Sequence, residues 1–372
     1  VSADGVNIPI YVWHREYESL PTNIIFEDAE ELNSFIVRLA YFARKHISIA
    51  KPILDAGLPD GSRVQLTYGS EITRRGSTFT IRRFRLDPLT ITDLISFNTL
   101  SPDMAAYFWY AIENRASILV AGGVASGKTT TLNCLSMFIK PELKIVSVED
   151  TAELNLPHEN WIPSIVRPGF GSEDGKAGAI TLFDLLKAAV RQRPDYIIVG
   201  EVRGEEAYTL FQAMATGHLG MSTVHAESVD AVVHRLESEP LNIPRPLLTM
   251  IDIIMVQLRT EINGKPGRRA LNVTEVVAMD PRTKELLTNS VYQWDSKSDT
   301  FLYSGRSYVL ERNMKKMSLN DKDVRAELHR RKAVLEWMAK NNIRRYTDVV
   351  PVIREYYADP DRVYRRAKVG AL

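Results

Sequence analysis

The residues best suited to chemistry lie in a glycine-rich segment one third of the way along the chain. Gly122, four intervening residues and Gly127-Lys128-Thr129 fit a pattern that closes backbone N–H groups around phosphate oxygens. Lys128 is then expected to reach the β and γ phosphates, and the Thr129 hydroxyl to ligate Mg²⁺. The expected cradle consists of Gly122, Gly123, Val124, Ala125, Ser126, Gly127, Lys128, Thr129 and Thr130.

The flanks of this segment favour a phosphate site over a chance glycine turn. The apolar run 117–121 is typical of a buried strand, and 129–139 has the apolar spacing of a helix. The start of that helix would place partial positive charge beside the phosphates. The pattern therefore predicts a strand, a glycine loop and a helix in that order.

Carboxylates follow two later apolar runs. Glu149 heads a cluster with two further carboxylates, which could orient metal-bound waters or merely cap a loop. Glu201 follows the run 196–199, with Gly200 at the position where such motifs usually carry Asp. Glu201 is therefore expected to polarise a water for in-line attack on the γ phosphate, or to hold Mg²⁺ through a water.

Two histidines flank one expected strand, in a chain that has seven histidines in all. His225 comes at the carboxyl end of that strand, and His218 lies before its start. A lone histidine there would more often be structural. The pair favours a role in which His225 donates a hydrogen bond to a γ-phosphate oxygen and senses its loss.

Strands and helices alternate over roughly 118–260. The expected strands are 118–121, 144–148, 196–199, 221–224 and 251–258, and the expected helices are about 129–139, 181–193, 205–216 and 228–237. Such alternation predicts an α/β domain with a mainly parallel sheet covered on both faces. Ligands of these sheets lie beyond the carboxyl ends of the strands, where the candidate residues fall.

The preceding part, 1–88, is expected to form a smaller α+β domain. Its expected strands are 8–13, 23–26, 63–68 and 78–84, with Pro21 punctuating the first two, and its helix runs from about Asp28 to His46 with Asp28 as N-cap. Arg63 and Arg82 lie on two of these strands. They either form a solvated basic face or point at the phosphates of a neighbouring subunit.

The chain after about 270 is expected to form an α+β extension (271–372) of the domain that starts at 89, whose core is about 101–270. Short antiparallel strands are expected at 271–279, 287–294 and 300–303. The remainder is helical and basic. A solvated helical face explains this charge, and docking to an acidic membrane surface or partner is the alternative.

Composition sets outer limits on the protein class. The 372 residues allow two or three domains, and 45% hydrophobic and 25% charged residues are typical of a globular protein. A net charge of +1 gives no reason to expect direct nucleic-acid binding. The single Cys134 excludes a disulfide framework or a multi-cysteine zinc site, and it is expected to be buried. No apolar run approaches the ~18 residues of a membrane span, so a cytoplasmic protein is expected. The chain begins with Val1, and a segment could precede it.

Together these clusters resemble the type II/type IV secretion ATPase superfamily over nearly the whole chain. Gly122–Thr129 matches its Walker A box, Glu149–Glu153 its Asp box, Val199–Glu201 its Walker B box, and Gly217–His225 its His box. The strands carrying Arg63 and Arg82 look like the arginine-bearing strands of its N-terminal domain. The segment Asn155–Trp161, and Gly204 where bacterial members usually have Asp, look like archaeal members.

The resemblance implies a RecA-like P-loop ATPase that uses ATP and Mg²⁺ and works as a homo-hexamer. Lys128 and Glu201, with Glu149 alternative or assisting, would act on the phosphates, with Arg82 and Arg63 reaching across a domain or subunit boundary. The motor would lie at the cytoplasmic face of the membrane, docked on a polytopic platform protein, and would serve pilus assembly, secretion or an archaellum. Two alternatives remain open: a DNA-transfer ATPase of conjugation systems, and a scaffold that binds ATP without hydrolysing it.

Overall fold

The computed structural model describes residues 1–14, 17–84, 86–167, 178–262 and 264–370. The chain divides into two compact units, Val1–Leu86 and Asp87–Leu372. Among the helices that lie within the described ranges, none has the length and apolar character needed to cross a bilayer.

The first unit is an antiparallel sheet with one long helix, α1 (Ala29–Phe42). The sheet order is β3-β2-β1-β6-β5-β4. Its strands are β1 (Ser2–Ala3), β2 (Pro9–His14), β3 (Glu18–Ile25), β4 (Ile53–Gly57), β5 (Arg63–Thr67) and β6 (Thr78–Arg82). The expected N-cap is confirmed, because the Asp28 carboxylate accepts a hydrogen bond from the Glu31 N–H at 3.1 Å. Leu32 and Ile36 of α1 are fully buried against the sheet residues Leu66 and Phe79.

Three sequence predictions for this unit are wrong in detail. The helix ends at Phe42 rather than His46, and Arg44 adopts the left-handed φ of 53° that commonly ends helices. Pro21 does not separate strands but lies inside β3. The strands β1 and β4 are absent from the sequence prediction.

The second unit is built on a nine-stranded sheet of order β15-β14-β13-β12-β7-β11-β10-β8-β9. Strands β12 through β9 in this order are mutually parallel, whereas β13, β14 and β15 extend the sheet as antiparallel hairpins. The strands are β7 (Ile118–Gly122), β8 (Ile145–Glu149), β9 (Trp161–Ile165), β10 (Tyr196–Val199), β11 (Leu219–Val224), β12 (Ile253–Ile262), β13 (Lys265–Met279), β14 (Leu286–Asp295) and β15 (Thr300–Tyr303). The predicted parallel sheet with an antiparallel extension is confirmed.

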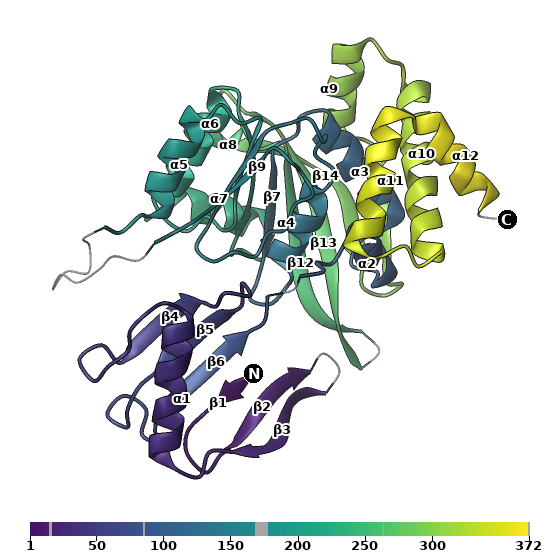
Figure 1. The fold of residues 1–372 in the computed structure, drawn as a ribbon. Helices are drawn as coiled ribbons and strands as arrows, with labels where there is room; N and C mark the ends of the chain where they lie inside the picture. Colours follow the sequence, from purple (N-terminus) through teal and green to yellow (C-terminus); the bar gives the residue numbers. More distant parts are fainter. Residues whose placement is uncertain (15–16, 85, 168–177, 263, 371–372) are drawn as a thin grey trace. The chain divides into compact units, whose positions relative to one another are not determined.

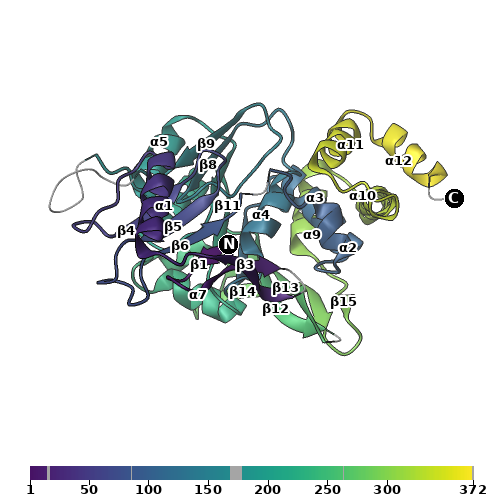
Figure 2. The same ribbon diagram turned by 60° about the horizontal axis from the view of Figure 1, so that its bottom comes forward.

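Helices cover both faces of this sheet, as the alternation of apolar runs predicts. They are α2 (Ile91–Ser96), α3 (Pro102–Glu113), α4 (Lys128–Ser136), α5 (Leu182–Arg191), α6 (Glu206–Ala215), α7 (Val229–Glu237), α8 (Arg245–Leu248), α9 (Tyr308–Met317), α10 (Asp321–Lys340), α11 (Tyr346–Ala358) and α12 (Pro360–Val369). Successive strand residues alternate between two cores: Ile118 and Val120 pack with α3 and α4, whereas Leu119 and Ala121 pack with α5 to α7. Figures 1 and 2 both show α5 and the helices α10 to α12 at opposite ends of this unit.

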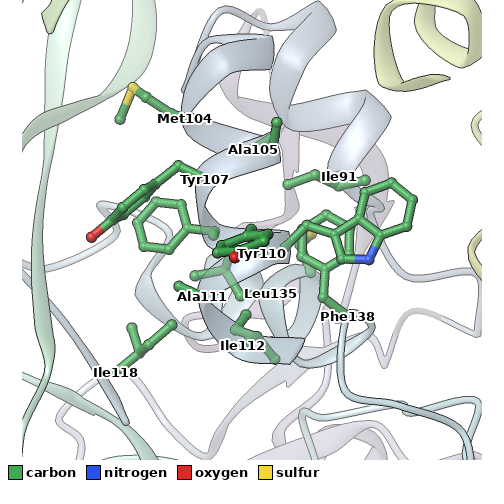
Figure 3. Close-up of a cluster of buried hydrophobic side chains, with 14 of the residues drawn as sticks. Ile91, Met104, Ala105, Tyr107, Tyr110, Ala111, Ile112, Ile118, Leu135 and Phe138 are labelled. Atoms are coloured by element: carbon green, nitrogen blue, oxygen red, sulfur yellow. The ribbon is translucent and has the colours of Figure 1, made fainter. Parts of the chain in front are cut away.

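The C-terminal helices share a core with α3 and α4 rather than forming an appendage. Trp109 of α3 stacks on Phe138 with ring centroids 5.1 Å apart, and it also contacts the Tyr356 ring of α11. Leu335 and Met338 of α10 are fully buried in the same cluster, part of which Figure 3 shows around α3. The strand that the sequence predicts at 271–279 starts earlier in the structure, because β13 begins at Lys265 and continues the hairpin from β12.

Candidate functional site

The glycine loop connects the end of β7 to the start of α4, where the sequence predicts it. Gly127 is the N-cap of α4 and adopts a left-handed φ of 95°, which L side chains rarely accept. Gly122 allows a close approach, because a Cβ there would overlap the Gln257 carbonyl oxygen and the Ser126 hydroxyl. Both glycines therefore hold a tight loop in front of a helix N-terminus, which is the geometry of an anion cradle.

Lys128 turns back over this loop. Its side chain is mostly buried, and the ammonium donates a hydrogen bond of 2.9 Å to the Gly123 carbonyl. The Ser126 hydroxyl donates to the same carbonyl at 3.0 Å. Burial lowers the pKa of Lys128, and the negative charges of Glu201 and Glu153 partly oppose that shift. A buried ammonium held by a loop carbonyl is suited to exchanging that partner for phosphate oxygens.

Glu149 ends β8 and is deeply buried, with 3% of its surface exposed. One carboxylate oxygen accepts hydrogen bonds from the Glu153 and Leu154 N–H groups, each at 3.0 Å. Burial nevertheless raises the pKa of Glu149 to about 7. A Cβ at Gly200 would lie 3.2 Å from the Glu149 Cγ, so the missing Asp position is next to the Glu149 side chain.

Glu201 and His225 meet at the same edge of the sheet. The His225 Nε2 lies 3.3 Å from a Glu201 carboxylate oxygen, and both side chains are partly exposed. The strands β8, β10, β11 and β7 are parallel neighbours, so their carboxyl ends lie along the same edge of the sheet. The structure thus places four predicted residues at or just beyond that edge: Lys128, Glu149, Glu201 and His225.

Two carboxylates shape the loop after β10: Glu206, to which sequence reasoning gave no role, and Asp150, which belongs to the predicted cluster headed by Glu149. Glu206 is buried and accepts hydrogen bonds from the Arg203 and Gly204 N–H groups, both at 2.8 Å. Asp150 forms an ion pair with the Arg203 guanidinium and so joins the loops after β8 and β10. The sequence signal for Glu206 was its position three residues after Arg203, a spacing at which a carboxylate can accept hydrogen bonds from nearby backbone N–H groups.

Sequence reasoning also missed the support given by the hairpin of β12 and β13. Gln257 pairs with Gly122 in the parallel register, and its side-chain oxygen accepts a hydrogen bond of 2.8 Å from the Thr131 hydroxyl of α4. Arg268 of β13 donates from Nε to the Ala125 carbonyl at 3.0 Å. No local pattern marks these residues, because they reach the loop only through strand pairing.

The remaining predicted residues, Arg63 and Arg82, lie in the first unit. They are directly opposite each other on β5 and β6. A guanidinium nitrogen of Arg63 lies 3.6 Å from a carboxylate oxygen of Asp55, and both side chains of this ion pair are well exposed. The arrangement therefore presents two cations side by side on one sheet face.

One side chain at the start of α4 is a candidate ligand for Mg²⁺. Thr129 follows the buried Lys128 at the first turn of α4. Within the described ranges, no group of three or more His, Cys, Asp or Glu residues could hold a metal ion by itself. Mg²⁺ commonly takes one or two protein ligands together with phosphate oxygens and waters, and the Thr129 hydroxyl is of a kind that can serve as one of them.

Known proteins show the same fold and family. The ATPase DotB of Legionella pneumophila is similar in structure, with a TM-score of 0.50 and 16% sequence identity. The match covers 98% of this chain and 90% of that chain. This similarity supports the RecA-like fold with an N-terminal domain. An uncharacterized protein of Methanocaldococcus jannaschii is 47% identical over 72% of this chain and 98% of its own length. The type IV secretion system protein PtlH of Bordetella pertussis is 31% identical over 69% of this chain and 82% of its own length.

The family model described as type II/IV secretion system protein matches residues 9–341. That match spans both units and includes the glycine loop and every strand end that carries a site residue. The chain therefore belongs to the type II/IV secretion system protein family.

Proposed function

We propose that the chain hydrolyses ATP to ADP and phosphate and uses the cycle to drive a secretion or pilus-type machine. The observation that best supports this is the placement of Lys128, Glu149, Glu201 and His225 at the same edge of the parallel sheet as the loop 122–130, with Glu201 and His225 in contact. The loop amides and Lys128 would bind the β and γ phosphates. Mg²⁺ would be held by Thr129, with Glu201 reaching it through a water, and would neutralise charge on the phosphates.

Two carboxylates are suited to act on the attacking water. Glu201 keeps the role that its position predicts, and its contact with His225 gives it a second group able to sense the γ phosphate. Glu149 is the alternative or assisting base, because a carboxyl with a pKa of about 7 can accept a proton near neutral pH. His225 would donate a hydrogen bond to a γ-phosphate oxygen.

The mechanical part of the proposal concerns the two units. The segment around Asp87 and Pro88 joins them and would act as the hinge that converts closure of the site into rotation. In a homo-hexameric ring, Arg82 and Arg63 would act across a unit or subunit boundary as arginine fingers. The ring would dock on a polytopic membrane platform at the cytoplasmic face and serve pilus assembly, secretion or an archaellum.

The test is steady-state phosphate release from Mg²⁺–ATP. Lys128→Ala should abolish turnover because charge and positioning are both lost, whereas Glu201→Gln should keep ATP bound and nearly stop hydrolysis. Lys322→Ala on the exposed surface of α10 is the matched control and should turn over at the wild-type rate. Undiminished turnover in Glu201→Gln would remove Glu201 from its role, and no phosphate release by the wild type would favour the non-hydrolysing scaffold.

A DNA-transfer ATPase is the second candidate, favoured by the basic last turn of α12 with Arg366 and Lys368. DNA would then stimulate turnover, and the stimulation would fall steeply with added salt. If DNA does not change the rate of ATP turnover at low salt, the proposal remains a secretion or pilus-type machine.

A further inference from the structure

Arg268 reaches the glycine loop from outside the predicted motif. It lies on β13, which pairs with β12, and β12 lies beside β7 with Gln257 opposite Gly122. Arg268 Nε donates a hydrogen bond of 3.0 Å to the Ala125 carbonyl. Strand pairing therefore brings a cation to a loop residue 143 positions earlier in the chain.

The residue that it holds has an unfavourable backbone conformation. Ala125 adopts a left-handed φ of 57° although it carries a Cβ. That conformation is unfavourable for a residue with a Cβ, so an outside contact would help the loop to keep it. A hydrogen bond from a guanidinium supplies one.

Holding the Ala125 carbonyl also sets the direction of a donor. In a trans peptide the C=O of one residue and the N–H of the next point in opposite directions. The guanidinium on the Ala125 oxygen therefore turns the Ser126 N–H away from β13. Ser126 lies in the expected phosphate cradle, so Arg268 orients one of its amide donors.

A second contact extends the brace to the start of α4. A Cβ at Gly127 would meet the Arg268 Cδ at 3.1 Å and the Gln257 Nε2 at 3.2 Å, so both side chains lie against this glycine. Gln257 in turn accepts from Thr131 on α4. The hairpin thus contacts the loop at Ala125 and Gly127 and also contacts the helix that follows.

We propose that Arg268 is a positioning residue that holds the glycine loop in its phosphate-binding conformation. The inference rests on the proposed nucleotide site, which it deepens. Arg268 acts through the Ala125–Ser126 peptide and sets nucleotide affinity. Its removal should raise KM and the dissociation constant with little change in kcat, because Lys128, Glu149 and Glu201 stay in place.

Direct titration with a fluorescent ADP analogue and Mg²⁺ tests this on the whole chain. Arg268→Gln should bind about tenfold more weakly, as expected for losing one charge-assisted hydrogen bond. Arg268→Lys should stay close to Arg268→Gln, because an ammonium cannot reproduce the fixed Nε donor. Arg282→Gln, on the exposed turn after β13, loses the same charge and should bind as the wild type does.

Amide hydrogen exchange of the nucleotide-free protein is the second measurement. Arg268→Gln should exchange faster over 123–127 while the thermal midpoint stays close to that of the wild type. Wild-type affinity and exchange in Arg268→Gln would overturn the inference and leave the proposed function standing. Full recovery in Arg268→Lys would assign the effect to charge alone and overturn the positioning role. A wild-type protein that binds no nucleotide would overturn both proposals.

Discussion

Glu149 combines deep burial with two hydrogen bonds from backbone N–H groups to one carboxylate oxygen. The hydrogen bonds favour the charged form, but burial outweighs them and raises the pKa to about 7. Gly200 lies against the same side chain, so a bulkier residue there would press on Glu149. The sequence shows an absent Asp at position 200, whereas the structure shows a second carboxylate in contact with that position.

The raised pKa predicts a pH-dependent stability. The pKa of Glu149 is about 7 in the folded protein and has its ordinary value of 4.5 in the unfolded chain. The folded state is therefore stabilised relative to the unfolded state below about pH 4.5, and this contribution is lost as the pH rises through about 7. Urea unfolding of nucleotide-free protein should therefore show Glu149→Gln gaining stability over the wild type between pH 5 and pH 8. The full effect is roughly 3 kcal/mol for such a shift.

The substitution Glu149→Gln changes the charge and keeps the local hydrogen bonds, because an amide oxygen can accept from the Glu153 and Leu154 N–H groups as the carboxylate does. Glu159→Gln on the exposed loop is the control, and its difference from the wild type should be the same at both pH values. A constant difference for Glu149→Gln as well would show that Glu149 titrates in its ordinary range.

At the scale of elements, α3, α10 and α11 are held together by one buried guanidinium. Arg331 of α10 is 3% exposed and pairs with Glu113 of α3 and with Glu327. Its guanidinium also lies over the rings of Trp109 and Tyr356, with centroid distances of 5.2 and 5.5 Å. A charge in this setting is costly to leave without its partners.

Replacing Arg331 should therefore loosen the whole helical cluster. Arg331→Ala leaves Glu113 and Glu327 without their buried cation, for which we expect a loss of about 3–5 kcal/mol in unfolding free energy. Arg325→Ala breaks an exposed i,i+4 pair with Asp321 on the same helix and should cost little. Urea titration of both variants checks this, and equal midpoints would contradict the role of Arg331.

The strands that the sequence failed to predict, or predicted too short, lie mostly at sheet edges. β3, β4 and β9 are each the last strand of their sheet. Pro21 lies in β3 and Pro163 in β9, and a proline argues against a strand unless the strand is at an edge. The central strands β7, β8 and β10 were predicted closely, because burial on both faces gives them continuous apolar runs.

The candidate site divides in the same way. The positions of Lys128, Glu149 and Glu201 could be predicted because each lies at or just after the end of a buried strand or of the glycine loop. Arg268 and Gln257 could not, because only the pairing of β12 with β7 and β13 brings them to the loop.

For the whole molecule, the paired arginines of the first unit carry the prediction about assembly. Arg82→Ala should leave nucleotide affinity unchanged and lower turnover per subunit only at protein concentrations where rings form. Arg83→Ala, the adjacent cation just outside β6, is the matched control. The measurement is phosphate release over a range of protein concentrations. Equal rates for the wild type and Arg82→Ala would show that Arg82 is only part of a solvated strand face.

The hydrogen bond between the Lys128 ammonium and the Gly123 carbonyl affects how substitutions of that lysine are interpreted. An incoming polyphosphate must displace an internal acceptor, so the measured heat of binding is a difference between two bonds and understates the attraction of the cation for the anion. Removing the side chain also releases the loop before any ligand arrives. Weak binding by Lys128→Ala would thus combine the loss of the contact to phosphate with the loss of order in the free loop. Lys128→Met keeps the apolar stem of the side chain and would separate these two effects.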